Sequence, residues 1–205
     1  ASAPRPCGGQ QGSLSVWAMA VILREPWTIE RFLSWEDRQE TRHEFDGTRI
    51  LEMTGGSRAH QRIVLNLAHL LMSRLDATRF DVLQEMRIAS GGKVRYPDVA
   101  VCHGPVPDGT KTLQDALVLF EVLSPDTAVT DRGEKRADYA GLPGLRHYVL
   151  VEQDQRAAVV LTRTAEGWTE APPATGSEVA LPALGLTLDL NAIYAGTAVP
   201  VQRRA

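Results

Sequence analysis

A short apolar run near the middle of the chain sets the strongest limit on the fold. Residues 117–123 read LVLFEVL, a nearly continuous apolar stretch of strand length. Such a run is typical of a central strand covered on both faces, because both sets of alternating side chains must then leave water. Glu121 interrupts the run, and a carboxylate in that position needs a counter-charge, hydrogen bonds or a metal ion.

A second carboxylate stands in a similar position. Residues 94–102 are expected to form a strand, and Asp98 lies inside it. Two acids on neighbouring strands could share a divalent cation, since Mg²⁺ takes one or two protein carboxylates and keeps several waters and substrate phosphate oxygens. This predicts Mg²⁺ or Mn²⁺ as the cofactor and phosphodiester hydrolysis as the chemistry. The alternative is that the two acids pair with arginines such as Arg95 or Arg132.

Helical periodicity marks the N-terminal half. Thr28 can cap a first helix and Ser57 a second one that ends near Leu75, because apolar residues recur every three or four positions in both stretches. Between these helices, residues 42–53 are expected to form a hairpin around the two-residue turn signal Asp46-Gly47.

Strands dominate the remainder. One is expected over residues 80–88. Thr130 and Asp131 open a helix that stops before Gly141, and residues 147–152 form the next buried strand. Strand, helix and strand in succession predict a parallel crossover. An antiparallel tail is expected over residues 157–164, 168–170, 178–180 and 186–188, with a last helix over residues 190–194.

Length and composition favour one domain. The chain has 205 residues, 43% of them apolar. Residues 1–18 mix Pro, Gly, Gln and Ser and are expected to be a disordered leader, with the domain over residues 19–195 and a tail over 196–205. Met19 is a candidate for the true start. A signal peptide is the weaker alternative, because the basic region is thin and the apolar core is broken.

Charge and cysteine usage narrow the class. The net charge of -3 argues against a protein that coats DNA through a global basic field, but not against local phosphate contacts. Cys7 and Cys102 are too few for a disulfide framework or a zinc cluster, so a reducing, cytoplasmic location is expected. No apolar run reaches the roughly 18 residues of a membrane span.

Several short motifs together carry a family resemblance. Pro97-Asp98 is followed by EVLSP from Glu121 and by DRGEK from Asp131. In this order and spacing the chain resembles the Uma-type restriction endonuclease family, within the PD-(D/E)XK nuclease superfamily, over roughly residues 27–195. The remaining matching positions are Glu44, Asp46-Gly47, Met53, Ala59-His60-Gln61-Arg62 and His147-Tyr148.

The resemblance implies an α/β (α+β) fold, with a restriction-endonuclease-like mixed β-sheet core flanked by helices and an antiparallel C-terminal extension. It implies Asp98 and Glu121 as metal ligands and Glu44 as an accessory acid. The superfamily pattern ends in a lysine two residues after the second acid, where this chain has Leu123. Relatives of this type move the lysine to the next helix, so Lys135 is the implied replacement that assists the nucleophile or stabilises phosphate charge.

Several of these side chains also have a plainer interpretation. Lys135 lies in a charge run, and such runs are usually exposed helix faces. Glu44 could be an exposed cross-strand partner of Arg49. His60 is expected to be a capping or partly buried histidine with a satisfied ring nitrogen rather than a catalytic residue. Of the neighbours Gln84 and Glu85, one can line the cleft while the other must face away.

The sequence thus predicts a Mg²⁺-dependent DNA endonuclease, with a two-fold homodimer as the natural geometry if both strands are cut. The first alternative is a catalytically silent nuclease-like domain that binds nucleic acid or protein, and the second is a hydrolase of small phosphorylated molecules. Seven basic residues are available for phosphate contacts: Arg58, Arg62, Arg87, Lys93, Arg95, Arg132 and Arg136.

Overall fold

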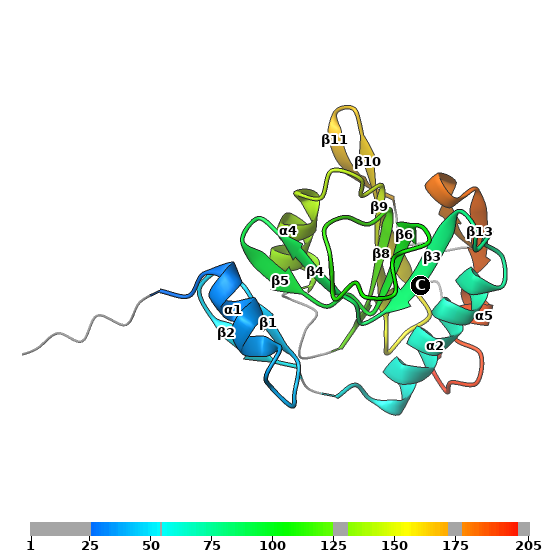
Figure 1. Cartoon of the computed structure of the whole chain (residues 1–205). Coiled ribbons are helices and arrows are strands. Elements are labelled where there is room, and N and C mark those ends of the chain that lie inside the picture. The colour runs from blue at the N-terminus through cyan, green and yellow to red at the C-terminus, as the bar shows by residue number, and fades with distance from the viewer. Residues whose placement is uncertain (1–25, 54, 125–130, 172–177, 201–205) are drawn as a thin grey trace, which may run out of the picture.

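The computed structural model describes residues 26–53, 55–124, 131–171 and 178–200. The expected leader over residues 1–18 and the end of the tail lie outside these ranges. A six-stranded sheet forms the centre and a five-stranded sheet lies beside it (Figure 1). Helices α2 (Arg58–Met72) and α5 (Leu190–Ile193) lie on one side of the central sheet and α4 (Arg136–Ala140) on the other.

The central sheet confirms the prediction drawn from the apolar run. Strand β8 (Val118–Leu123) pairs in parallel with β9 (His147–Glu152) and antiparallel with β6 (Val99–His103). All six residues of β8 are buried. The strand order is β11-β10-β9-β8-β6-β3, with β3 (Phe80–Gln84), β10 (Ala158–Thr164) and β11 (Gly167–Glu170) completing the sheet.

The connection from β8 to β9 is the predicted parallel crossover. Among the described residues, its helical part consists of a π-helical turn, η1 (Asp131–Lys135), followed by α4. The expected helix start at Thr130 lies outside the described residues. Tyr139 of α4 is buried against Leu119 and Leu123 of β8, so α4 covers the face of the sheet opposite α2.

The second sheet carries the N-terminal elements. Its order is β2-β1-β5-β4-β7. The hairpin strands β1 (His43–Phe45) and β2 (Ile50–Glu52) confirm the predicted hairpin, and β4 (Arg87–Ser90), β5 (Lys93–Arg95) and β7 (Thr112–Leu113) complete the sheet. Helix α1 (Ile29–Glu36), capped by Thr28 as expected, packs on it through Phe32, whose ring stacks on Phe45 at 5.2 Å between centroids.

Two of the predicted strands are each divided between the sheets. The stretch 80–88 breaks at Glu85, which has a positive φ of 47°, and the stretch 94–102 breaks around Pro97. A left-handed residue and a proline both end regular pairing, since the first turns the chain and the second lacks an N–H donor. Asp98 consequently lies at a break between two sheets and not inside a continuous strand.

Two boundaries also differ from expectation. The hairpin turn has four residues, because Phe45 pairs with Ile50 and the Asp46 carboxylate accepts from the N–H groups of Thr48 and Arg49. This local side-chain bond favours the longer turn. Helix α2 begins after the predicted cap Ser57 but ends at Met72, three residues before Leu75.

The C-terminal segment is antiparallel, as expected. Strands β10 and β11 extend the central sheet, while β12 (Glu178–Leu181) and β13 (Leu186–Asp189) form a separate hairpin joined by η2 (Pro182–Leu184). Leu181 and Leu188 of this hairpin pack with α2 and α5 in one apolar cluster. Within the described residues, no helix has the length and apolar character needed to cross a membrane.

Candidate active site

A pocket of about 480 Å³ opens where the β1–β2 hairpin, the first turns of α2 and the ends of β8 and η1 meet. All four predicted site residues line it, namely Glu44, Asp98, Glu121 and Lys135. Glu85 also lines the pocket and Gln84 does not, but Glu85 lies at the break after β3, where its positive φ turns the chain. The fold thus gathers side chains that are spread over almost a hundred positions.

Asp98 and Glu121 are brought side by side by the sheet register. Val99 pairs with Phe120 in the antiparallel ladder between β6 and β8. Asp98 precedes Val99 and Glu121 follows Phe120, so the two acids stand opposite each other. The N–H of Val122 donates to Asp98 Oδ2 at 2.6 Å, so the backbone of β8 fixes this carboxylate. Neither acid pairs with the arginines considered in the alternative, because Arg95 binds Glu44 and Asp138 and Arg132 binds Glu152.

Lys135 reaches the acidic strand from the neighbouring helical turn. Its Nζ lies 3.2 Å from Glu121 Oε1, 3.0 Å from Glu44 Oε1 and 3.1 Å from Asp131 Oδ1. The residue is buried, with 7% of its surface exposed, so the interpretation of Lys135 as a solvated helix residue is wrong. One ammonium therefore faces three carboxylates.

The surroundings of Leu123 are apolar. Leu123 follows Glu121 by two positions and so belongs to the same side of β8. Its side chain is buried in the apolar cluster that also contains Tyr139, Tyr148 and Leu150. A lysine at position 123 would have to bury its charge among these side chains, which would cost several kcal/mol.

The contacts of Glu44 fix its orientation and exclude its interpretation as an exposed cross-strand partner of Arg49. It is buried, and its Oε2 accepts from Arg95 Nη1 at 3.0 Å while Oε1 accepts from the Tyr96 N–H at 3.3 Å. Arg49, the cross-strand partner considered for it, binds Asp46 instead. Glu44 thus points towards Lys135 and the pocket.

The electrostatics of the pocket favour the protonated form of Lys135 and disfavour the ionised form of Glu121. Burial and the charges of Asp131, Asp98 and Glu44 raise the pKa of Glu121 well above its usual value, although Lys135 lowers it in part. Burial tends to lower the pKa of Lys135, but the carboxylates of Glu121, Glu44 and Asp131 outweigh it and raise that pKa. The cluster therefore has too much negative charge for one lysine to balance.

His60 is placed in the pocket, in contact with Asp98. Its Nε2 lies 3.4 Å from Asp98 Oδ1, while its buried Nδ1 has no hydrogen-bond partner among the described residues. Burial lowers its pKa, but the bond to Asp98 and the charges of Asp98 and Glu85 raise it by more. The prediction of a partly buried histidine is confirmed, whereas helix capping belongs to Ser57. A Cβ on Gly56 would lie 2.6 Å from Nδ1, so glycine makes room for the ring.

Two tyrosines complete the cluster; the sequence marked Tyr148 only as a motif position and did not single out Tyr139. Tyr139 donates from its hydroxyl to Glu121 Oε1 at 2.8 Å, and the Tyr148 hydroxyl donates to the carbonyl of Asp131 at 2.9 Å. Asp131 itself is buried, with 1% exposed. Position Asp131 was visible only as part of a motif, because an acid at a helix start is ordinarily a capping residue.

The pocket can be tested for its fit to a divalent cation. Among the described residues, six carboxylates and one lysine line it; the carboxylates are those of Glu44, Glu52, Glu85, Asp98, Glu121 and Asp131. Both hydrogen bonds to Glu121 reach Oε1, and Asp131 Oδ1, although near Lys135, lacks a partner in hydrogen-bond geometry. Carboxylate oxygens are the donors that Mg²⁺ prefers. The donor chemistry and the excess negative charge therefore fit a hard divalent cation.

The donors do not form a closed cage. Within the described residues, no three of the His, Cys, Asp and Glu side chains are arranged as a group that could hold a metal ion. A Mg²⁺ ion that keeps several waters requires only one or two carboxylates, so Asp98 and Glu121 would suffice as its protein ligands.

Comparisons with known proteins identify the family of the chain. A sequence model of the Uma2 family, described as "Putative restriction endonuclease", matches residues 29–192. Uncharacterized protein slr1290 of Synechocystis is 30% identical over 174 residues, covering 82% of this chain and 92% of that protein. Uncharacterized protein sll1609 of the same organism is 30% identical over 142 residues, covering 66% and 80%.

One solved structure shares the fold. It is a crystal structure of "a putative nuclease belonging to DUF820" from Anabaena variabilis, with a TM-score of 0.69 and 17% sequence identity. The alignment covers 83% of this chain and 98% of that one. At this identity the likeness establishes the arrangement of helices and strands.

Proposed function

Because this chain belongs to the Uma2 family of putative restriction endonucleases, we propose that it is a divalent-metal-dependent endonuclease that hydrolyses phosphodiester bonds in DNA. Asp98 and Glu121 hold Mg²⁺ or Mn²⁺, Lys135 assists the nucleophile or stabilises phosphate charge, and Glu44 completes the acidic site. The enzyme acts in the cytoplasm, where its cysteines stay reduced.

The observation that carries the proposal is the position of Lys135. Its ammonium lies 3.2 Å from Glu121 Oε1, although it is 14 residues further along the chain. We take Lys135, which lies in η1 within the β8–β9 crossover, as the replacement for the usual lysine of the superfamily pattern. A buried ammonium beside two candidate metal ligands is well placed to orient a water or to neutralise an oxyanion.

The roles of the chain's own groups follow from their contacts. A bound divalent cation would supply an activated water and neutralise charge on the phosphate oxygens. The β8 backbone holds Asp98 through the Val122 N–H, and Tyr139 holds Glu121. Glu44 and Asp131 keep Lys135 protonated and directed into the pocket. Each reacting group is thus fixed before substrate arrives.

The test is cleavage of supercoiled and linear DNA by purified protein with Mg²⁺ or Mn²⁺, beside Asp98→Asn, Glu121→Gln and Lys135→Met. These changes keep the side-chain size and remove the charge. We expect each to reduce nicking by at least about a hundredfold, as the loss of an electrostatic catalytic group usually does. Lys111→Met is the matched control, since this exposed lysine pairs with Asp37 outside the pocket.

Mn²⁺ titration separates this proposal from a silent scaffold. The silent scaffold is supported by the three carboxylates around Lys135, because the lysine balances part of their negative charge without a metal. Absence of cleavage, together with equally weak Mn²⁺ binding by wild type and Glu121→Gln, would favour the scaffold. Turnover of a model phosphodiester without cleavage of DNA would instead indicate a hydrolase of small molecules.

A further inference from the structure

The structure sorts the basic residues into those available to a partner and those already engaged. Of the seven candidates for phosphate contacts, five are bound to carboxylates. Arg87 binds Glu36 and Asp37, and Lys93 and Arg95 both bind Asp138. Arg132 binds Glu152 and Arg136 binds Glu170. Arg87 and Arg95 are moreover buried, so these two are not available for phosphate contacts.

The two that remain lie together at the start of α2. Arg58 and Arg62 are exposed, and no hydrogen bond, ion pair or ring contact engages either of them among the described residues. They are one helical turn apart, about 6 Å along the axis, and therefore project from the same face.

This face adjoins the pocket. Gln61 is exposed next to Arg62 and lines the pocket, as do Ser57 and His60 of the same helical turn. The sequence of α2, RAHQRIVLNLAHLLM, contains no aspartate or glutamate, although the whole chain has 25 acids against 22 lysines and arginines. The same end of α2 thus lines a strongly acidic pocket and carries two unpaired arginines.

We propose that the face formed by Arg58, Gln61 and Arg62 binds the phosphate backbone of double-stranded DNA and leads it to the pocket. This inference rests on the proposed function for the identity of the polyanion. A diester entering a pocket with six carboxylates meets repulsion, and two unpaired guanidiniums on the helix whose first turn lines the pocket offset that repulsion for the flanking phosphates. Guanidinium groups also bind phosphate through two hydrogen bonds at once.

The contacts would be sequence-independent. Arginines directed at phosphates fix the position and register of the duplex, and they carry no base information. The inference therefore assigns α2 to positioning the substrate, separate from the residues that act on the scissile bond.

The test is duplex binding measured by fluorescence anisotropy at several salt concentrations, with all proteins carrying Glu121→Gln to prevent cleavage. The double variant Arg58→Gln/Arg62→Gln should bind about tenfold more weakly. The slope of log affinity against log salt should fall by about 1.8, because each lost phosphate contact removes about 0.9.

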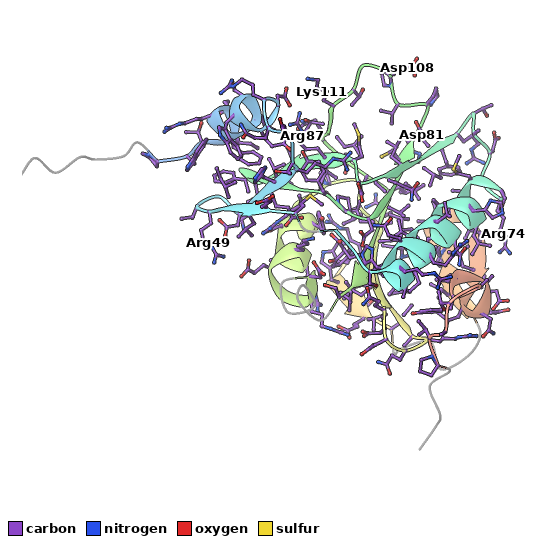
Figure 2. All side chains as sticks on the ribbon, turned by 90° about the horizontal axis from the view of Figure 1, so that it is seen from below. Arg49, Arg74, Asp81, Arg87, Asp108 and Lys111 are labelled. Atoms are coloured by element: carbon purple, nitrogen blue, oxygen red, sulfur yellow. The ribbon has the colours of Figure 1, made fainter. Side chains whose placement is uncertain are left out.

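Arg38→Gln/Lys111→Gln is the matched control. It removes the same charge from two exposed residues outside the pocket, and Figure 2 shows Lys111 at an edge away from α2. Its affinity and salt slope should equal those of the parent. An equal loss of DNA affinity in both double variants would mean that only net charge matters, which would overturn the inference. Complete displacement of the duplex by polyglutamate would overturn it as well.

Kinetics distinguish a failure of this inference from a failure of the proposed function. In the otherwise wild-type enzyme, Arg58→Gln/Arg62→Gln should raise the KM for DNA nicking and leave kcat and turnover of a model phosphodiester unchanged. Salt-dependent binding through the two arginines without any cleavage would sustain the inference and sink the nuclease. Cleavage of DNA with a KM unaltered in the double variant would support the nuclease and overturn the inference about the two arginines.

Discussion

At the scale of single residues, the candidate site depends on which side chain occupies the space next to Glu121. Leu123 is 3% exposed and packs with aromatic and aliphatic side chains, while Lys135 makes its three carboxylate contacts from η1. The two positions are complementary, because burying an ammonium is tolerable only where carboxylates compensate it. Position 135 has these partners and position 123 lacks them.

This complementarity leads to a prediction about restoring the superfamily pattern. Leu123→Lys should destabilise the protein by about 3 kcal/mol or more, because the ammonium enters an apolar cluster. Combined with Lys135→Met, it should not recover DNA nicking. Thermal unfolding and nicking assays check both outcomes. Leu123→Met, which keeps the volume, should cost less than about 1.5 kcal/mol. Recovery of nicking in the double variant would refute the assignment of the lysine's role to position 135 alone.

At the scale of elements, the pocket is made where regular pairing stops. The β3–β4 strand turns at Glu85 and the β5–β6 strand turns at Pro97, so both pass from one sheet to the other next to Asp98. The Glu85 N–H donates to the Asp98 carbonyl at 3.2 Å, which joins the two breaks. The site therefore lies between two sheets, with α2 supplying His60 to the same pocket.

A second junction of elements contains His147 and makes stability depend on pH. Its Nε2 accepts from the Ala183 N–H of η2, and its Nδ1 lies 3.1 Å from Thr162 Oγ1 in β10. The accepting Nε2 requires the neutral ring with its proton on Nδ1. Burial lowers the pKa of His147 below its ordinary 6.5.

Because the folded protein favours the neutral ring, this contribution to stability is complete above pH 6.5 and is lost as the pH falls below that value towards the lowered pKa. We expect the free energy of unfolding to fall in that range, by at most about 1.36 kcal/mol per pH unit for this group. The His147→Gln variant should show a weaker dependence in urea unfolding. If the free energy of unfolding depended on pH equally in both proteins, His147 would not titrate with unfolding. His60, whose pKa is raised, contributes a pH dependence of the opposite sign, and it does so equally in both proteins.

At the scale of the whole molecule, Arg95 joins the two sheets at the site. It is 1% exposed, extends from β5, and binds Asp138 of α4 at 2.8 Å and Glu44 of β1 at 3.0 Å. Helix α4 belongs to the crossover of the central sheet, so this guanidinium links that sheet to the N-terminal one. Burial opposes its charge, but Glu44 and Asp138 raise its pKa.

Arg95→Met should therefore act on the fold as a whole. Removing the guanidinium leaves two buried carboxylates whose remaining cationic partners, within the described part of the chain, are Lys93 and Lys135, and we expect this to cost about 3 kcal/mol. Urea unfolding should show a lower midpoint with an unchanged m-value. Arg38→Met, at an exposed position, should change stability by no more than about 0.5 kcal/mol. Equal stability of the two variants would contradict the linking role of Arg95.

The local features of this protein were determined by its sequence. The apolar run of β8, the caps Thr28 and Ser57, and the β8–β9 crossover depend on side-chain periodicity and short-range bonds, which are visible along the chain. The acids Asp98 and Glu121 were conspicuous for the same reason, since each lies in or beside an apolar strand.

Only the tertiary structure decided how the charges are paired. The contact of Lys135 with Glu121 spans 14 positions and that of Arg95 with Glu44 spans 51, and no periodicity reports such distances. The same cause divides the stretches 80–88 and 94–102 between two sheets. It also leaves Arg58 and Arg62 without a charged partner among the described residues, while five other basic residues are paired. A charge is satisfied by whatever the folded chain brings within a few ångströms, and that neighbour is set by the packing of the sheets and helices.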